Sequence, residues 1–467
     1  MYSTSPAAGR TQSQALAAFA LHVEASQFPD AVRNSARDHF LDSLGVALAS
    51  STFEFGDAVL AAARELGSGD DARAIGSGVT LPAASAALVN GTLVHGLDYD
   101  DTHIGAIYHA SAPAFAAALA TGQAVCASGA EVLDAYLIAL EIGCRLAGAA
   151  PGEFHARGLH PTAQCGVFAA AAASARLRRS KPDELVSALG LAGSQASGIL
   201  EIGRSWLKRL HPGWAAHAGL VADSLGRAGF LGPDTAFEGP HGFYAAHIGH
   251  VPDDGRLPAH RLGDIWHASD IALKPYPCCH FIHAFVDASL ALRDDVVIAD
   301  IERIDCLLSR ALHHMVAEPR GQKIRPSAVY EALFSVPYTV ALALVKGRID
   351  LAAYYDEPLD DARVLAVAER THCVDDPKSD YPKHFPGEIR IVLKDGRVLE
   401  QREATSLGTP ERPLARVAVE EKFMANASRA LGRERAQRVI EAVRNLDDMP
   451  RIDELLELCT TTSEKQA

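Results

Sequence analysis

The chain has 467 residues, of which 48% are hydrophobic and 22% are charged. This length favours two domains over one, and the composition is that of an ordinary globular protein. The formal net charge of -14 disfavours nucleic acid or an anionic membrane as a partner, because phosphate binding needs clustered Lys and Arg.

Targeting signals and cofactor motifs are missing from the sequence pattern. The first residues, MYSTSPAAGRTQSQ, contain no apolar run typical of a signal sequence, and no stretch reaches about 18 uninterrupted apolar residues, so we expect a cytoplasmic protein. The eight cysteines form neither a disulfide framework nor a paired CxxC pattern, and we expect no metal. No GxGxxG or P-loop lies between a strand and a helix, so we expect no nucleotide cofactor.

The first half of the chain has a helical pattern. Between about Thr11 and Leu262, Ala and Leu recur at helical spacing, and breaks fall at Gly, Pro and Asp clusters. The Ala stripes are interpreted as core packing between close helices. The spacing predicts helices over residues 112–126, 131–149, 166–177, 183–199 and 213–229.

A change of composition after Pro258 indicates a second domain. A helical stretch over 281–292 is followed by alternating apolar and polar residues over 301–308, which predict a strand. Residues 388–393 and 397–402 flank Lys394-Asp395-Gly396, a strong hairpin signal. Helical periodicity returns after about 404. The predicted fold is mainly α: a large all-helical domain from residues 1–265 and 404–467, and a smaller α+β lid domain over 266–403.

Two polar segments of the first domain suggest proton chemistry. HGLDYDDTHIGAIYHAS, residues 95–111, crowds acids and histidines that can hold and move protons, although the acids can also cap a helix, and a metal is a further alternative. In RGLHPTAQCG, residues 157–166, His160 precedes a predicted helix whose N-terminus suits a carboxylate. A histidine there is also commonly a packed hydrogen-bonding residue.

Two further segments suggest anion binding and catalysis. In SWLKRLHPGWAAHAG, residues 205–219, Lys208 and Arg209 precede a predicted helix, where cations oppose the helix dipole and so indicate an anion, unless both point to solvent. In LKPYPCCHFIH, residues 273–283, Lys274 lies beside rigid prolines, and a lysine shielded from water can act as acid or base. Cys279 is either a proton carrier or a small hydrophobic residue. No GxSxG elbow is present, which disfavours acyl transfer.

These segments also carry a resemblance that covers nearly the whole chain. The motifs NG-x-x-x-H-x-x-D-x-DDTH, HPT-x-x-CG, K-x-LH-x-G and KPYPCC, followed by FSVPYTVALAL, resemble the MmgE/PrpD family. The resemblance implies a large helical domain, a smaller α+β lid, a homodimer, and no metal or organic cofactor. Known activities of the family are 2-methylcitrate dehydratase, cis-aconitate decarboxylase and iminodisuccinate epimerase, so the implied substrate is a small anionic di- or tricarboxylate.

The resemblance also implies the site residues. The decarboxylase-like site maps, by motif, onto Asp98, Thr102, His109, His160, Lys208, Lys274 and Tyr338. A decarboxylase-type histidine after the second lysine falls on Cys279, and the first loop lacks the Trp-rich form of the dehydratases. Chain length and the KPYPCC form are more similar to the epimerase branch.

We therefore expect a cofactor-independent epimerase that removes and returns a proton next to a carboxylate of a substrate such as iminodisuccinate. Two acid/base groups are required on opposite faces of the carbanion, and His109 with either Lys274 or Tyr338 is the expected pair, with Asp98 orienting a histidine. Thr102, His160, Lys208, Cys279 and Arg325 are expected to bind substrate. A hydro-lyase or decarboxylase is the alternative. A non-catalytic helical binding protein is a further alternative, and it predicts that His109, Lys208 and Lys274 are scattered.

Overall fold

The computed structural model describes residues 9–203 and 205–461 and divides into two compact units. Unit 1 comprises Met1–Ile271 and Ala415–Ala467, and unit 2 comprises Ala272–Leu414. The mainly α class is thus found, together with one four-stranded sheet.

The unit boundaries differ from the predicted 265/266 and 403/404. Residues 404–414 stay with unit 2 because their backbone is bonded there: the Leu273 N–H donates to the carbonyl of Gly408 at 2.9 Å, and the Leu407 N–H donates to Asp287 Oδ2 at 2.7 Å. Helical periodicity returns only from Arg416.

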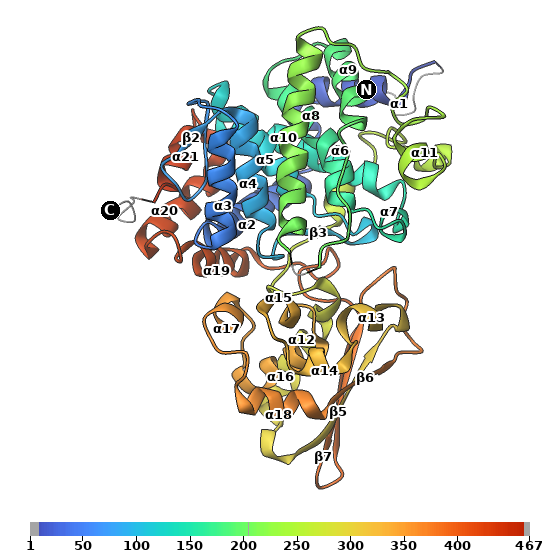
Figure 1. Cartoon of the computed structure of the whole chain (residues 1–467), viewed down its shortest axis with the longest axis vertical. Coiled ribbons are helices and arrows are strands. Elements are labelled where there is room, and N and C mark those ends of the chain that lie inside the picture. Colours follow the sequence, from blue (N-terminus) through green and yellow to red (C-terminus); the bar gives the residue numbers. More distant parts are fainter. Residues whose placement is uncertain (1–8, 204, 462–467) are drawn as a thin grey trace. The chain divides into compact units, whose positions relative to one another are not determined.

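Unit 1 is built from helices that pack around a buried centre (Figure 1). The described α-helices of unit 1 are α1 Gln12–His22, α2 Asp30–Ser50, α3 Glu54–Glu65, α4 Ala83–His95, α5 Ser111–Ala124, α6 Gly129–Gly148, α7 Glu153–Ala156, α8 Pro161–Leu177, α9 Pro182–Gly193, α10 Leu207–Arg227, α11 Phe243–Ile248, α19 Arg416–Ala427, α20 Arg433–Arg444 and α21 Asp453–Leu458. Its short strands are β1 Ala72–Arg73, β2 Thr80–Leu81 and β3 Thr102–His103.

The centre of unit 1 depends on small residues. Helices α4, α5, α8 and α10 pack closely together, and α8 is buried along almost its whole length. Where α10 crosses α4, a Cβ on Gly213 would lie 2.2 Å from the carbonyl oxygen of Leu88, and one on Gly91 would lie 2.8 Å from Cα of Gly213. Only glycine fits this approach. The predicted role of the small-residue stripes in core packing is confirmed.

Two predicted helix starts are wrong. Helix α8 begins at Pro161 rather than Gly166, because proline is well suited to the first helical position and Thr162 to Cys165 continue the buried helix. Helix α10 begins at Leu207 rather than Gly213, with Pro212 inside it. A proline there cannot donate the helical hydrogen bond to the carbonyl of Lys208, which makes it a poor start signal but a tolerated interruption near the N-terminus.

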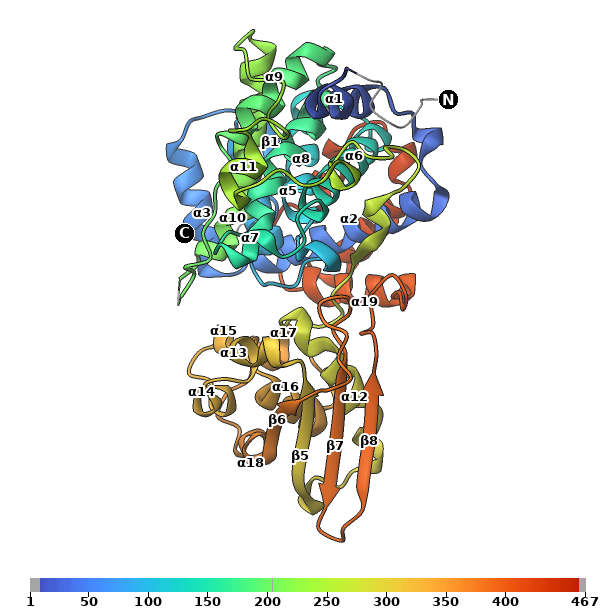
Figure 2. The same ribbon diagram turned by 90° about the vertical axis from the view of Figure 1, so that its right-hand side faces the viewer.

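Unit 2 is an α+β unit whose sheet has the order β6-β5-β7-β8 (Figure 2). Strands β5 and β6 are parallel, and the other neighbouring pairs are antiparallel. Helices α12, α16 and α18 pack against the sheet strands. The strands are β5 Ile301–Leu308, β6 Thr371–Asp375, β7 Gly387–Leu393 and β8 Val398–Glu403. A further short strand, β4 Ile271–Ala272, spans the unit boundary. The described α-helices of unit 2 are α12 His283–Leu292, α13 His313–Val316, α14 Arg320–Ile324, α15 Val329–Ala332, α16 Val336–Lys346, α17 Leu351–Tyr355 and α18 Ala362–Arg370.

The predicted strand and hairpin of unit 2 are confirmed. Strand β5 covers the predicted residues 301–308, and β7 pairs with β8 in antiparallel register from Gly387 opposite Glu403 to Val392 opposite Val398. Gly396 in the turn has φ of 86°, a conformation that glycine adopts without strain.

The described residues contain no single helix that is long and apolar enough to cross a membrane. Helices α2 and α3 pass the test of length and composition only as a pair, and they are bent by 92° at their junction.

Candidate active site

The loop between α4 and α5 carries most of the predicted polar residues of unit 1, and it is buried. Asp98, Asp100, Asp101, Thr102 and His109 each expose 6% or less of their surface. Burial of several charged groups is unfavourable unless they are paired. Their partners therefore decide what the loop can do.

Asp101 fixes the loop to the start of α5. Its Oδ1 accepts a hydrogen bond from the backbone N–H of Ser111 at 3.0 Å, and its Oδ2 lies 2.7 Å from Nδ1 of His39. Burial alone would raise the pKa of Asp101, but the interactions with His39 and Ser111 outweigh it and lower the pKa. Asp101 is not the cap residue of α5, which is Ala110, but it accepts from the N–H of the first helical residue, in agreement with the alternative in which an acid of this segment orients a helix start.

Asp100 holds His95, a histidine that the sequence interpretation did not select. Nδ1 of His95 lies 2.8 Å from Oδ2 of Asp100 and 2.9 Å from Oδ1. Because a carboxylate accepts, Nδ1 carries the proton and Nε2 keeps its lone pair in the neutral ring. Nε2 is buried and has no hydrogen-bond partner among the described residues. His95 is thus a further candidate base. The sequence feature that could have identified it is its place in the NG-x-x-x-H motif.

His109 has a similar arrangement. Its Nδ1 lies 2.8 Å from the backbone carbonyl oxygen of Asp101, which can only accept, so Nδ1 carries the proton. Its backbone N–H donates to Thr162 Oγ1 at 3.1 Å, and Thr102 Oγ1 lies 3.4 Å from Nδ1. The Nε2 atom, on the other side of the ring, lies 4.0 Å from Oδ1 of Asp98. The loop and α8 together hold this ring in one orientation.

Lys208 and Asp98 form an ion pair that joins α10 to the loop. Lys208 Nζ donates to Oδ1 of Asp98 at 2.9 Å, and the two side chains are 14% and 6% exposed. Asp98 has φ of 53°, in the left-handed region that Asp tolerates better than most residues. The predicted anion near the start of α10 is therefore supplied, at least in part, by the protein itself. A substrate carboxylate at Lys208 would compete with Asp98.

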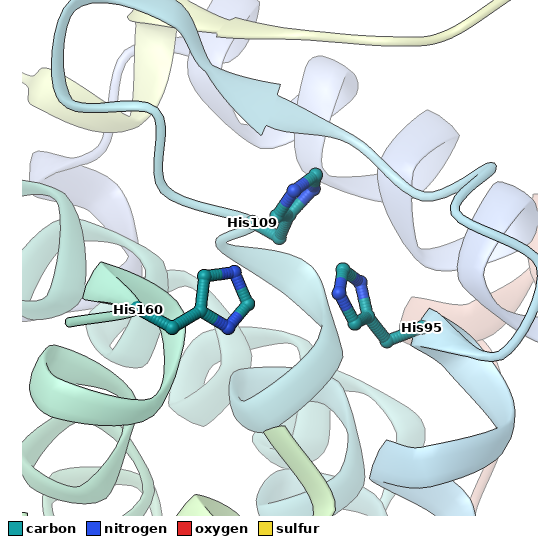
Figure 3. Close-up of side chains that lie close together, drawn as sticks. All are labelled: His95, His109 and His160. Atoms are coloured by element: carbon teal, nitrogen blue, oxygen red, sulfur yellow. The ribbon is translucent and has the colours of Figure 1, made fainter. Parts of the chain in front are cut away.

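Three imidazoles from three elements converge in unit 1 (Figure 3). His95 ends α4, His109 precedes α5 and His160 precedes α8; the ring centroid of His160 lies 5.6 Å from that of His95 and 5.9 Å from that of His109. His160 Nδ1 is also 3.0 Å from Nδ1 of His211.

Burial keeps His160 and its neighbour His211 neutral. It lowers the pKa of His160 well below the usual value, helped by His95 and by the positive charge of Lys208. Burial, followed by His95 and Lys208, lowers the pKa of His211 to about 4. At neutral pH these rings are hydrogen-bonding groups rather than charges. The alternative interpretation of His160, as a packed hydrogen-bonding residue, agrees with this contact to His211.

The same group has the donors for a metal. Ligand atoms of His95, His109 and His160 lie within 4.8 Å of one another, as do those of His95, Asp98, Asp100 and His109. The Lys208 ammonium beside Asp98 opposes a second cation. We assign no metal to this group, and the expected absence of a metal stays a prediction.

In unit 2, the KPYPCC segment lies against the residues that begin α16. The Cys279 N–H donates to the carbonyl of Leu333 at 2.9 Å, and the Tyr338 N–H donates to Oγ of Ser335 at 3.1 Å. Lys274 is 1% exposed and Cys279 is 6% exposed. The fold of unit 2 thus brings two motifs that are far apart in the sequence into one neighbourhood.

The remaining predicted residues of unit 2 differ in their surroundings. Burial, followed by the acids Asp361 and Glu357, raises the pKa of Tyr338 to about 12, so the phenol keeps its proton at neutral pH. It can donate a proton but is a poor base. Arg325 is exposed, and its guanidinium forms an ion pair with Glu369.

Lys323 and Lys422 are buried or half-buried lysines that the sequence interpretation missed. Lys323 donates to the carbonyls of Met315 at 2.6 Å and Phe334 at 2.7 Å in unit 2. Lys422, from α19, lies 2.6 Å from Asp42 Oδ1 and donates to the carbonyl of Tyr99 at 2.9 Å. Lys422 therefore supports the site loop from the C-terminal part of unit 1.

The arrangement in unit 1 is that of an acid–base catalyst: oriented imidazoles, buried carboxylates and a positive group. The non-catalytic alternative predicts that His109, Lys208 and Lys274 are scattered, but the first two both approach Asp98 in unit 1. That prediction stays untested for the third. Lys274 belongs to unit 2.

Comparison with known families identifies the chain more closely. The MmgE/PrpD N-terminal domain matches residues 14–254, and the MmgE/PrpD C-terminal domain matches residues 276–448. The chain belongs to the MmgE/PrpD family, as its motifs predicted, and is an enzyme of that family.

Several curated relatives are named as decarboxylases or dehydratases, which are lyases. Cis-aconitate decarboxylase of Mus musculus is 27% identical over 91% of this chain and 89% of its own length. Cis-aconitate decarboxylase of Aspergillus terreus is 25% identical over 94% of both chains. A 2-methylcitrate dehydratase of Cupriavidus necator is 25% identical over 79% of this chain and 80% of its own length. These similarities favour a lyase over the epimerase that the sequence interpretation placed first.

Proposed function

We propose that the chain is a lyase that acts on a small di- or tricarboxylate by moving a proton at a carbon next to a carboxylate. The observation that carries the proposal is the buried ring of His109, whose Nδ1 donates to the carbonyl oxygen of Asp101 at 2.8 Å. The decarboxylase and dehydratase relatives support the substrate class. A homodimer and a cytoplasmic location remain predictions.

In this proposal His109 Nε2 exchanges the proton at carbon. Decarboxylation breaks a bond between carbon and the leaving carboxylate, and the electron pair left on carbon takes up a proton. Dehydration instead removes a proton from carbon while a hydroxyl leaves with another proton. His109 serves either reaction, and Tyr338, which keeps its proton at neutral pH, is the proposed donor to a leaving group.

The proposed role of the lysines is to hold and neutralise the substrate. Lys208 exchanges its bond to Asp98 for one to a substrate carboxylate, while the neutral ring of His160 and the ring of His95 offer hydrogen bonds. Lys274 is proposed as the second positive group, from the family resemblance and its near-complete burial in unit 2.

Epimerisation of a substrate such as iminodisuccinate is the second candidate. Its support is Cys279, which stands where the resemblance to the decarboxylases implies a histidine. Cys279 is only 6% exposed, so at this position it acts as a small apolar side chain. Such a site would lack one proton donor that the decarboxylases have.

The test is proton NMR of the purified chain in deuterated water with cis-aconitate, 2-methylcitrate and iminodisuccinate offered separately. Itaconate signals from the first or new vinyl signals from the second would support the lyase. Deuterium entering iminodisuccinate at Cα, with loss of optical purity and no lyase product, would assign the epimerase instead. Silence with all three substrates would exclude these three as substrates and leave the family membership unchanged.

His109→Gln and His217→Gln form a matched pair for this test. His217 also places Nδ1 near a carbonyl, that of Ala84 at 3.0 Å, but lies outside the site loop. We expect His109→Gln to lower kcat at least about 100-fold, as removal of a general acid–base group does, and His217→Gln to leave it within about twofold. Equal activity of the two variants would remove His109 from the proposed role.

A further inference from the structure

A second cluster of metal-ligating side chains lies in unit 1, on residues that the proposed mechanism does not use. His103, His267 and Asp270 each offer a ligand atom, and these atoms lie within 4.8 Å of one another. The two imidazole rings are nearly parallel, with centroids 6.3 Å apart and an angle of 21° between their planes. His103 comes from β3, and the other two come from residues 267–270.

His103 is the unusual member of this cluster. It is only 6% exposed, and neither of its ring nitrogens has a hydrogen-bond partner among the described residues. A buried imidazole without partners loses its hydration without compensation, which is unfavourable. A bound cation would satisfy one nitrogen, and His267 and Asp270, which are more exposed, leave a path for the cation to enter.

We propose that His103, His267 and Asp270 bind one divalent transition-metal ion of the zinc type. Two imidazoles and one carboxylate are a common donor set for such ions, with water completing a tetrahedron. Bonds of about 2.0 to 2.1 Å place donors about 3.3 Å apart. The side chains therefore have to close by at most about 1.5 Å. For the exposed Asp270 this exchanges existing contacts, such as the one that Oδ1 accepts from Ser269 Oγ at 3.5 Å, for the stronger bond to the ion.

The surrounding charges permit this ion. Arg145 is the neighbouring cation, and its guanidinium is occupied by Glu141 at 2.5 Å and by the carbonyls of Pro258, His260, Arg261 and Ile265. Glu141 also accepts from the N–H of Ala268 at 2.9 Å, next to His267. The positive charge of Arg145 is thus compensated, and residues 267–270 are anchored to α6.

The position of the ion would connect it to the candidate active site. The His103 N–H donates to the carbonyl of Tyr108 at 2.7 Å, and the Tyr108 N–H donates back to the carbonyl of His103 at 3.2 Å. This pair closes a short loop whose flanking residues are Thr102 and His109. An ion on His103 would stiffen the base of that loop without contacting the reacting atoms.

The test is zinc binding by the full chain, previously stripped with a chelator, measured by isothermal titration and by metal analysis after gel filtration. We expect tight binding that falls by one ion per chain, or weakens at least about tenfold, in both His267→Gln and Asp270→Asn, since loss even of an outer-sphere partner costs about 10- to 100-fold. His217→Gln is the control for a histidine outside the cluster. Circular dichroism checks that each variant folds.

Two outcomes would overturn the proposal. Absence of zinc uptake by the wild-type chain would show that an ordered water, rather than an ion, serves His103. Zinc uptake that is the same in His267→Gln and Asp270→Asn as in the wild type would place the ion elsewhere, including at His95, His109 and His160. Because binding is measured without turnover, the result does not depend on which reaction the enzyme catalyses.

Discussion

At the scale of single residues, the ion pair of Lys208 and Asp98 gives the most direct test of the proposed site. We expect Lys208→Met to lower kcat/KM at least about 100-fold and to destabilise unit 1 by about 2 to 4 kcal/mol, because Asp98 is left buried without its partner. Lys208→Arg keeps the charge and is the matched control, with a smaller loss. Steady-state kinetics and urea unfolding measure the two effects.

A double-mutant cycle isolates the pair itself. Asp98→Asn removes the buried charge, so adding it to Lys208→Met should restore part of the stability but not the activity. If Lys208→Met were as stable as the wild type, the ion pair would have no structural role. Activity restored along with stability would show that the lysine does not bind substrate.

At the scale of elements, the close crossing of α4 and α10 sets the position of Lys208 and His211. Gly213→Ala would place a Cβ 2.2 Å from the carbonyl oxygen of Leu88, so the helices must separate. We expect a stability loss of about 1 to 3 kcal/mol and a fall in activity. Gly193→Ala, whose Cβ would lie 3.9 Å from Phe168, is the control and should change little. If both variants kept the stability and activity of the wild type, the two helices would be able to separate at their crossing without cost.

Helix α19 acts on the site loop through one side chain. Lys422→Met leaves Asp42 buried and unpaired and releases the carbonyl of Tyr99. We expect a loss of about 3 to 5 kcal/mol, as for other broken buried ion pairs, with partial recovery when Asp42→Asn is added. Chemical unfolding of the single and double variants measures this. No recovery in the double variant would assign the loss to the Tyr99 contact alone.

At the scale of the whole molecule, the histidines of unit 1 make its stability depend on pH. Burial, then the charge of Lys208, lowers the pKa of His155 to about 4, whereas an unfolded histidine has its usual value near 6.5. Between these values the unfolded chain binds the extra proton, so this group's contribution is present above about pH 6.5 and is lost as pH falls to about 4.

The corresponding variant is His155→Gln. It should unfold with a shallower pH dependence than the wild type between pH 6.5 and 4, by at most about 1.4 kcal/mol per pH unit. All three tryptophans, Trp206, Trp214 and Trp266, belong to unit 1, so their fluorescence follows this unit alone. Identical slopes would contradict the lowered pKa.

The sequence predicted local features better than distant partnerships. The hairpin of β7 and β8 was found because Lys394-Asp395-Gly396 is a local signal, and the Ala-rich core because helical spacing is local as well. The starts of α8 and α10 were misplaced because Pro161 and Pro212 were interpreted as lying before helices. Proline at a first helical position begins a helix, and a later one can be tolerated within it.

The site residues were also easier to predict from local motifs than from contacts between distant parts of the chain. Asp98, Thr102, His109, His160 and Lys208 were found by motif, and the structure places them together in unit 1. His95 was included among the crowded histidines of residues 95–111 but was given no role of its own, and Lys422 was missed, because both roles depend on which partners the fold brings to them. Nothing near Lys422 in the sequence indicates that it meets Tyr99, which is 323 positions away.

Unit 1 is built from two stretches of chain that are separated by the whole of unit 2, and this imposes an order on its synthesis. Domains generally fold as they leave the ribosome, N-terminal parts first, at about 5 to 20 residues per second. Helix α19 and Lys422 emerge only after unit 2 has been translated. Translation of unit 2 takes on the order of 10 seconds at this rate. During that time the nascent helices around α2 expose the surface that α19 later covers, and Asp42 has not yet met Lys422. The enzyme therefore acquires its supported site loop as one of the last events of biosynthesis, when unit 2 is already complete.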